Sequence, residues 1–186
     1  GFELHTALAV RVESWTAAQR PEGVVVGLFD QQCRCPRPVP EGETRGQRLR
    51  RPRKSQWWAA GLQMAGRPPA GSRWIYVADC ESDFYEPIER AQQHTVDFVI
   101  RSYQDRCLAE SDEHVRAALE RAPVLGQTTV EVRARPGRAA RTALVELRSV
   151  RVDLAGPWRP GGQRPPLRDV GVVEVREVQV PAGVSE

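Results

Sequence analysis

Hydrophobic residues in the first part of the chain occur in short runs, which are separated by turns and by two helix-like segments. Four runs have the β-branched and aromatic residues typical of strands, and they are residues 4–12, 24–29, 74–78 and 96–100. Two segments have the boundary residues of helices, and they are residues 55–65 and 83–93. The first two strands predict an antiparallel hairpin. The strand–helix–strand order over residues 74–100 predicts a βαβ unit with parallel strands.

The pattern changes after residue 106, where alternation of polar and apolar residues becomes frequent. Residues 111–121 predict one more helix, with acidic side chains near its positive end. Three strand-like runs follow, at residues 128–135, 142–152 and 170–180. Alternation such as Val173-Glu174-Val175-Arg176 is typical of an antiparallel sheet with one face in solvent. We therefore expect two regions, residues 1–106 and residues 107–186.

Residues 33–54 lack regular periodicity and predict an exposed loop, because they contain four prolines and eight basic residues against two acidic ones. Of the 27 basic residues in the chain, only Lys54 is a lysine. Arginine can bind phosphate through two parallel hydrogen bonds, so this loop could contact DNA. The residues concerned are Arg48, Arg50, Arg51, Arg53 and Lys54. The alternative is a solvated connector whose arginines reflect a GC-rich genome.

Composition narrows the class of protein. Hydrophobic residues make up 40% of the 186 residues and charged residues 27%, which favours a folded chain over a disordered one. No apolar run approaches the ~18 residues of a membrane span, so we expect a cytoplasmic protein. The cysteines lack paired metal-site spacing and the histidines are scattered, so we expect four reduced thiols, at Cys33, Cys35, Cys80 and Cys107. Both ends lie beside strand-like runs, so we expect a piece of a longer protein.

The segment most informative about chemistry is Val77-Ala78-Asp79-Cys80-Glu81-Ser82-Asp83-Phe84-Tyr85-Glu86. Asp79 follows a predicted parallel strand, at the sheet edge where α/β proteins bind ligands. Its carboxylate can coordinate a hard cation such as Mg²⁺. Either Glu81 or Asp83 can brace that site while the other caps the following helix, where Glu86 also lies. The alternative is that all four acids only cap and solvate the start of this helix.

The segment Asp79–Glu86 resembles the Asp-Arg-Glu-Ser/Ala-Asp-Ile-Tyr-Glu box of DDE transposases of the insertion-sequence family four kind. Three other segments resemble that family in order and approximate spacing, and they are Gly1–His5, Lys54–Trp57 and Phe98–Ser102. The resemblance implies an α/β ribonuclease-H-like core over residues 1–106, with a mixed sheet that lacks its first strand. It implies that residues 107–186 are a β-rich insertion in the same domain.

The resemblance also implies a chemistry. In that family an Asp-Asp-Glu triad holds two Mg²⁺ ions, or Mn²⁺, and a homodimer cuts and joins DNA at transposon ends. Matched by motif, Asp79 is the second catalytic Asp and a metal ligand, and Arg101 lies at a basic position that would contact a DNA phosphate. The alternative for Arg101 is an ion pair with a nearby acid. The resemblance also implies a bacterial protein associated with the nucleoid. Cys80 stands where the box has a basic residue, which puts a phosphate contact there in doubt. The other two catalytic acids would lie outside the chain, so we expect no cleavage by it alone.

Two other functions fit the same residues. One is a non-catalytic remnant that binds nucleic acid through its basic surface. The other is a metal-dependent phosphohydrolase whose whole site is Asp79, Glu81 and Asp83. A missing first strand would also leave two strand edges unpaired, so we expect the chain alone to be partly unfolded or to self-associate.

Overall fold

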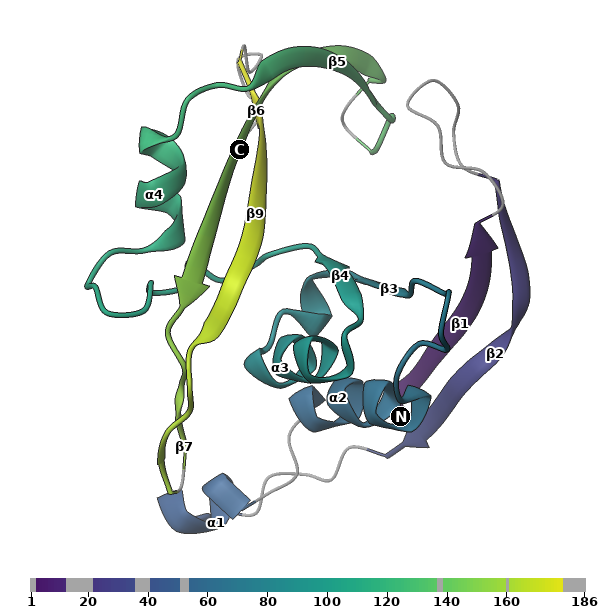
Figure 1. The fold of residues 1–186 in the computed structure, drawn as a ribbon, viewed down its shortest axis with the longest axis vertical. Coiled ribbons are helices and arrows are strands. Elements are labelled where there is room, and N and C mark those ends of the chain that lie inside the picture. The colour runs from purple at the N-terminus through teal and green to yellow at the C-terminus, as the bar shows by residue number, and fades with distance from the viewer. Residues whose placement is uncertain are drawn as a thin grey trace. The chain divides into compact units, whose positions relative to one another are not determined.

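The computed structural model describes residues 3–12, 22–35, 41–50, 54–136, 139–159 and 161–178. Its elements group into two units, residues 1–101 and residues 102–186 (Figure 1). The boundary lies five residues before the one that the sequence pattern predicts. Each unit is described by itself below.

The first unit begins with the predicted hairpin. Strand β1 (Glu3–Val12) pairs antiparallel with β2 (Gly23–Arg34), from Glu3 opposite Arg34 to Val12 opposite Gly23. The register of this pairing shifts between Ala7 and Leu8 and again between Ala9 and Val10. Strand β2 continues to Arg34, so it extends five residues beyond the predicted run.

The predicted βαβ unit is confirmed. Helix α2 (Lys54–Ala65) precedes strand β3 (Ile75–Ala78), the short 3-10 helix η1 (Cys80–Ser82), helix α3 (Tyr85–His94) and strand β4 (Asp97–Ile100). Strands β3 and β4 are parallel, and Ile75 lies opposite Asp97 while Ala78 lies opposite Ile100. Helix α2 ends as predicted, because Gly66 has a φ of 75° and donates its N–H to the Leu62 carbonyl.

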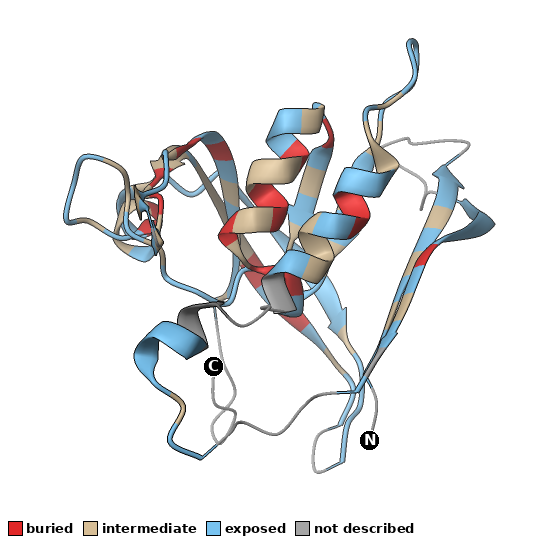
Figure 2. Cartoon of the chain, turned by 90° about the horizontal axis from the view of Figure 1, so that it is seen from below, coloured by how far each residue is buried: buried red, intermediate tan, exposed pale blue. Residues whose placement is uncertain are grey.

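One face of the β3–β4 sheet carries the core of this unit. Leu62 of α2, Ala91 of α3 and Val96 are buried there against Tyr76 and Phe98. The opposite face is apolar but exposed, with Ile75, Val77 and Val99 showing 46%, 71% and 62% of their surface. Figure 2 shows buried positions on the helices of this unit and mostly exposed positions along the hairpin. Parallel sheets are usually covered on both faces, so this face is unusual.

Helix α1 (Arg45–Arg50) corrects the prediction of a loop over residues 33–54. Its start is a capping box: the Gln47 N–H donates to Thr44 Oγ1 at 3.3 Å, and the Thr44 N–H donates to Gln47 Oε1 at 2.9 Å. This reciprocal pair satisfies two donors that a loop would leave to water. The sequence contains the Thr-x-x-Gln pattern of a capping box at residues 44–47, but the many arginines and prolines around it favoured the prediction of a loop.

The second unit contains the predicted antiparallel sheet. Its strands are β5 (Gly126–Val132), β6 (Arg141–Leu154) and β9 (Leu167–Glu177), in the order β5-β6-β9. Two short strands, β7 (Trp158–Arg159) and β8 (Gly162–Gln163), form a hairpin that the sequence did not predict. Helix α4 (Val115–Arg121) starts four residues later than predicted, because His114 pairs with Cys107 in an antiparallel bridge.

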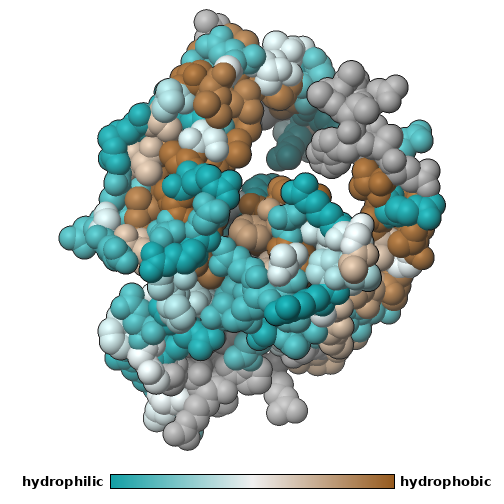
Figure 3. All heavy atoms as spheres, viewed as in Figure 1, coloured by the Kyte–Doolittle hydropathy of each residue, from teal (hydrophilic) through white to brown (hydrophobic). Residues whose placement is uncertain are grey.

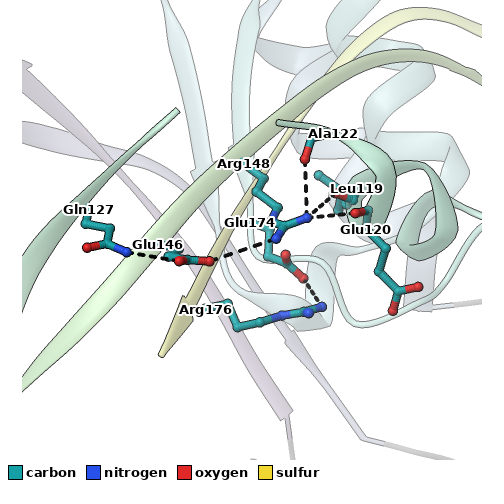
Figure 4. A network of polar contacts seen from close by, with 8 residues as sticks. All are labelled: Leu119, Glu120, Ala122, Gln127, Glu146, Arg148, Glu174 and Arg176. Carbon is teal, nitrogen blue, oxygen red and sulfur yellow. Dashed lines mark hydrogen bonds and ion pairs between the residues drawn. The ribbon is translucent and has the colours of Figure 1, made fainter. Parts of the chain in front are cut away.

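Helix α4 is attached to the sheet at its carboxyl end by Arg148 of β6. Its Nη1 donates to the carbonyls of Leu119, Glu120 and Ala122, at 3.5, 2.7 and 3.2 Å (Figure 4). Glu146 lies 3.9 Å from the Arg148 guanidinium and accepts a hydrogen bond from Gln127 of β5. One guanidinium therefore satisfies carbonyls that the end of a helix leaves unpaired.

The ribonuclease-H-like sheet stays a prediction. Among the described strands of residues 1–101, β1 pairs with β2 and β3 pairs with β4, in two separate two-stranded sheets. Hydrophobic side chains are exposed on the hairpin, among them Leu8, Val25 and Leu28, and Figure 3 shows apolar surface over this region.

Candidate functional site

Two charged residues follow the two parallel strands at the same edge of their sheet. Asp79 comes directly after β3, and Arg101 comes directly after β4. The Arg101 N–H donates to the Ala78 carbonyl at 3.2 Å, which extends the ladder and fixes the start of the segment after β4. Both residues are exposed. The βαβ order thus places a carboxylate and a guanidinium at one carboxyl edge of the sheet, and the pattern of strands predicts this position for Asp79.

The Arg101 side chain is oriented by Cys80. Its Nη2 lies 3.2 Å from Cys80 Sγ, and this hydrogen bond is the main reason that the pKa of Arg101 is raised. The negative charge of Asp79 raises the pKa of Arg101 further. Cys80 therefore holds the Arg101 guanidinium beside the residues that follow β3.

The segment Asp79–Asp83, called the acidic loop below, folds into one turn of 3-10 helix because its first residue caps that turn. Asp79 is the N-cap of η1, and its Oδ1 accepts the Glu81 N–H at 3.0 Å. Ser82 is completely buried, and its hydroxyl lies 2.7 Å from the hydroxyl of Tyr76. Burial raises the pKa of Tyr76 to about 12. The buried Ser82 and the partly buried Tyr76 thus anchor the loop to β3.

The other three acids of this segment differ in their exposure. Glu81 is exposed, Asp83 is 4% exposed, and Glu86 lies half-buried in the first turn of α3. Within the described residues, no group of three His, Cys, Asp or Glu side chains could hold a metal ion. Asp79 offers a single carboxylate, so the described residues supply one ligand of a Mg²⁺ site and not a complete set. A site made of Asp79, Glu81 and Asp83 alone also gains no support.

A cleft of about 540 Å³ lies beside the acidic loop, and the sequence did not reveal it. Its lining comes from β1, β2, the first turns of α2 and the loop: Glu3, Leu4, His5, Thr6, Gln32, Trp57, Trp58 and Glu81. His5 and Trp58 meet edge to face, with their ring centroids 4.1 Å apart. No periodicity links these segments, because only the packing of the hairpin against α2 brings them together.

The basic segment stays a prediction. Arg48 and Arg50 lie in α1 and Lys54 opens α2, but their side chains lie outside the description, as do Arg51 and Arg53 entirely. None of the helices in the described ranges is long and apolar enough to cross a membrane.

Comparison with known proteins adds no family. No protein-family model matches the chain, and no curated protein is significantly similar to it.

Proposed function

We propose that the chain is part of the catalytic core of a DDE-type transposase, in which Asp79 is one of three metal-binding acids and Arg101 contacts a DNA phosphate. The observation that carries the proposal is the placement of Asp79 and Arg101 at the carboxyl edge of the parallel strands β3 and β4. Ligands of open α/β sheets bind at this edge. The resemblance of residues 79–86 to the family's acidic box supplies the reaction class.

The chemistry expected of each residue follows from its side chain. Divalent Mg²⁺ ions, when bound, would activate the attacking oxygen and stabilise the leaving oxygen of an in-line displacement. Asp79 would supply carboxylate oxygen to such an ion. Arg101 is exposed and presents a fork of donors that matches two phosphate oxygens. Its bond to Cys80 orients that fork before DNA arrives.

The test uses a longer protein that contains this chain together with two further catalytic acids, and a supercoiled plasmid that carries transposon ends. We expect Mg²⁺-dependent nicking that Asp79→Asn abolishes. The matched control is Asp97→Asn, because Asp97 lies at the opposite end of the same sheet, where it pairs with Arg73. Nicking that survives Asp79→Asn, or that is lost equally in Asp97→Asn, would contradict the proposed role.

A second arm separates cleavage from DNA binding. The chain of residues 1–186 alone should not nick the plasmid, because clamping two Mg²⁺ ions needs more oxygen ligands than Asp79 supplies. Mg²⁺-dependent nicking by this chain, lost in Asp79→Asn, would show that the site is complete without further acids. If the longer protein binds DNA and never cleaves it, the non-catalytic alternative holds instead.

A further inference from the structure

Cys107 and His114 form a cross-strand pair outside the site described above. They are opposite each other in an antiparallel bridge, flanked by hydrogen bonds from the Leu108 N–H to the Glu113 carbonyl, 2.8 Å, and from the Val115 N–H to the Arg106 carbonyl, 3.0 Å. This pattern defines a pair that is not hydrogen-bonded through its own backbone, where side chains approach most closely. Cys107 Sγ lies 3.2 Å from His114 Nε2, and both residues are exposed.

The backbone around the pair is held on both sides. Leu108 forms a bridge with Leu154 at the end of β6, the Ala109 N–H donates to the Asp153 carbonyl at 2.7 Å, and the Ala155 N–H donates to the Cys107 carbonyl at 3.0 Å. Beyond His114 the chain enters α4 directly. Strand pairing thus brings the thiol and the imidazole within reach of each other.

We propose that Cys107 and His114 are a nucleophilic thiol–imidazole pair, and that Cys107 forms mixed disulfides with small-molecule disulfides faster than an exposed cysteine without such a partner. Thiolate is the reactive form of cysteine, and an adjacent base activates a nucleophile of this kind. With the ring proton on Nδ1, Nε2 faces the thiol and can accept its proton. The exposure of both residues gives a small disulfide access to the sulfur.

The proposed reaction is a thiol–disulfide exchange. As the thiol proton passes to His114 Nε2, Cys107 Sγ attacks one sulfur of the small disulfide, and the bond between its two sulfurs breaks. The departing thiolate takes the proton back from His114 and leaves as a thiol. Cys107 is oxidised to a mixed disulfide and one sulfur of the reagent is reduced, so no further oxidant is needed. The inference does not rest on the proposed transposase function.

The experiment measures the rates of all the thiols in one sample of the full chain. We use a Cys35→Ser chain, so that Cys33 is an exposed reference thiol without a neighbouring cysteine two residues away. Limiting iodoacetamide at pH 7 reports nucleophilicity, and glutathione disulfide reports mixed-disulfide formation, with each site quantified by peptide mass spectrometry. We expect Cys107 to react about tenfold faster than Cys33, because a positioned base commonly contributes at least this much.

Two variants and one condition test the cause. His114→Gln keeps a polar side chain but removes the base, so it should lower the rate of Cys107 to that of Cys33. His94→Gln, on α3, should leave both rates unchanged. In the Cys35→Ser chain with His114 intact, unfolding by urea should make Cys107 and Cys33 react at the same rate. Equal rates of Cys107 and Cys33 in buffer, a measurement that needs no histidine variant, would overturn the proposal, and so would a fast Cys107 in His114→Gln.

Discussion

Tyr76 and Ser82 show how much the acidic loop depends on one buried contact. Ser82 is completely buried, and its Oγ lies 2.7 Å from the Tyr76 hydroxyl oxygen. The loop that carries Asp79 is only one turn of 3-10 helix, closed by hydrogen bonds from the Ser82 and Asp83 N–H groups to the Asp79 and Cys80 carbonyls. So short a helix has little stability of its own. The Tyr–Ser pair therefore positions Asp79 through the backbone.

We expect Tyr76→Phe to loosen this loop, because a buried hydroxyl without its partner costs about 1–3 kcal/mol. The amides of Ser82 and Asp83 should exchange hydrogen at least about fivefold faster, since 1.4 kcal/mol is a factor of ten. Tyr103→Phe is the matched control, because Tyr103 is 77% exposed. Unchanged exchange in Tyr76→Phe would show that the turn holds without the pair.

The same tyrosine gives a prediction at high pH. Burial raises the pKa of Tyr76 to about 12, whereas a tyrosine in an unfolded chain ionises near pH ~10. Between these values the folded chain keeps a proton that the unfolded chain loses, so stability is fully present below pH ~10 and falls as pH rises toward about 12. In an absorbance titration, Tyr76→Phe should remove the last ionising phase. A late phase that persists in the variant would contradict this assignment.

The helices and strands were predictable where their signals are local. Gly66 predicts the end of α2, although the helix begins at Lys54, one residue before the predicted Ser55 start. The apolar runs around Tyr76 and Phe98 predict a parallel pair with Asp79 at its carboxyl edge. Features that depend on contacts between distant segments were not predictable. The burial of Ser82, the cleft beside Glu81 and the Cys107–His114 bridge all arise from packing or pairing, for which a single sequence has no periodic signature.

The attachment of α4 tests one such long-range contact. Helix α4 has seven residues, too few to be stable alone, and Arg148 binds three carbonyls at its end. Arg148→Met keeps most of the aliphatic stem but removes the donors, at a cost of about 1–3 kcal/mol. We expect faster hydrogen exchange at Ala118 and Ala122. Arg151→Met, which breaks an exposed pair with Asp169, should change α4 little, and equal effects in both variants would contradict the role of Arg148.

Acid should weaken the sheet of the second unit. Arg141 of β6 forms two hydrogen bonds with Glu177 of β9 and lowers the pKa of that carboxyl below its usual 4.5. The Asp169 N–H, and then Arg168, lower the pKa of Asp153 below 3.8. Carboxyls with lowered pKa values stabilise the fold above their unfolded-state values, and this contribution is lost as pH falls through the folded-state values. We expect the β-sheet circular dichroism signal to decline below about pH 4, and Arg141→Gln to make that decline shallower.

The last prediction concerns the chain as a whole and the two open sheets of its first unit. Within the described residues, β1 and β3 each pair along one edge, and Val77, Val99 and Leu8 are exposed. A strand edge with apolar side chains is a template for association. Each backbone hydrogen bond left unmade in a buried setting costs about 1–3 kcal/mol, against a usual total stability of about 5–15 kcal/mol.

We therefore expect residues 1–186 alone to self-associate or to melt without cooperativity, as measured by light scattering and calorimetry. If the first strand of a ribonuclease-H-like sheet fills the space next to β1 and β3, a longer protein with that strand should melt cooperatively as a defined species. Val77→Lys gives a second test, because Val77 lies on the exposed face of β3. The added charge should reduce self-association of residues 1–186, and it should lower the stability of a longer protein in which this face is buried. A monomeric, cooperative transition for residues 1–186 would show that the two sheets are stable as they stand, and would count against a missing strand.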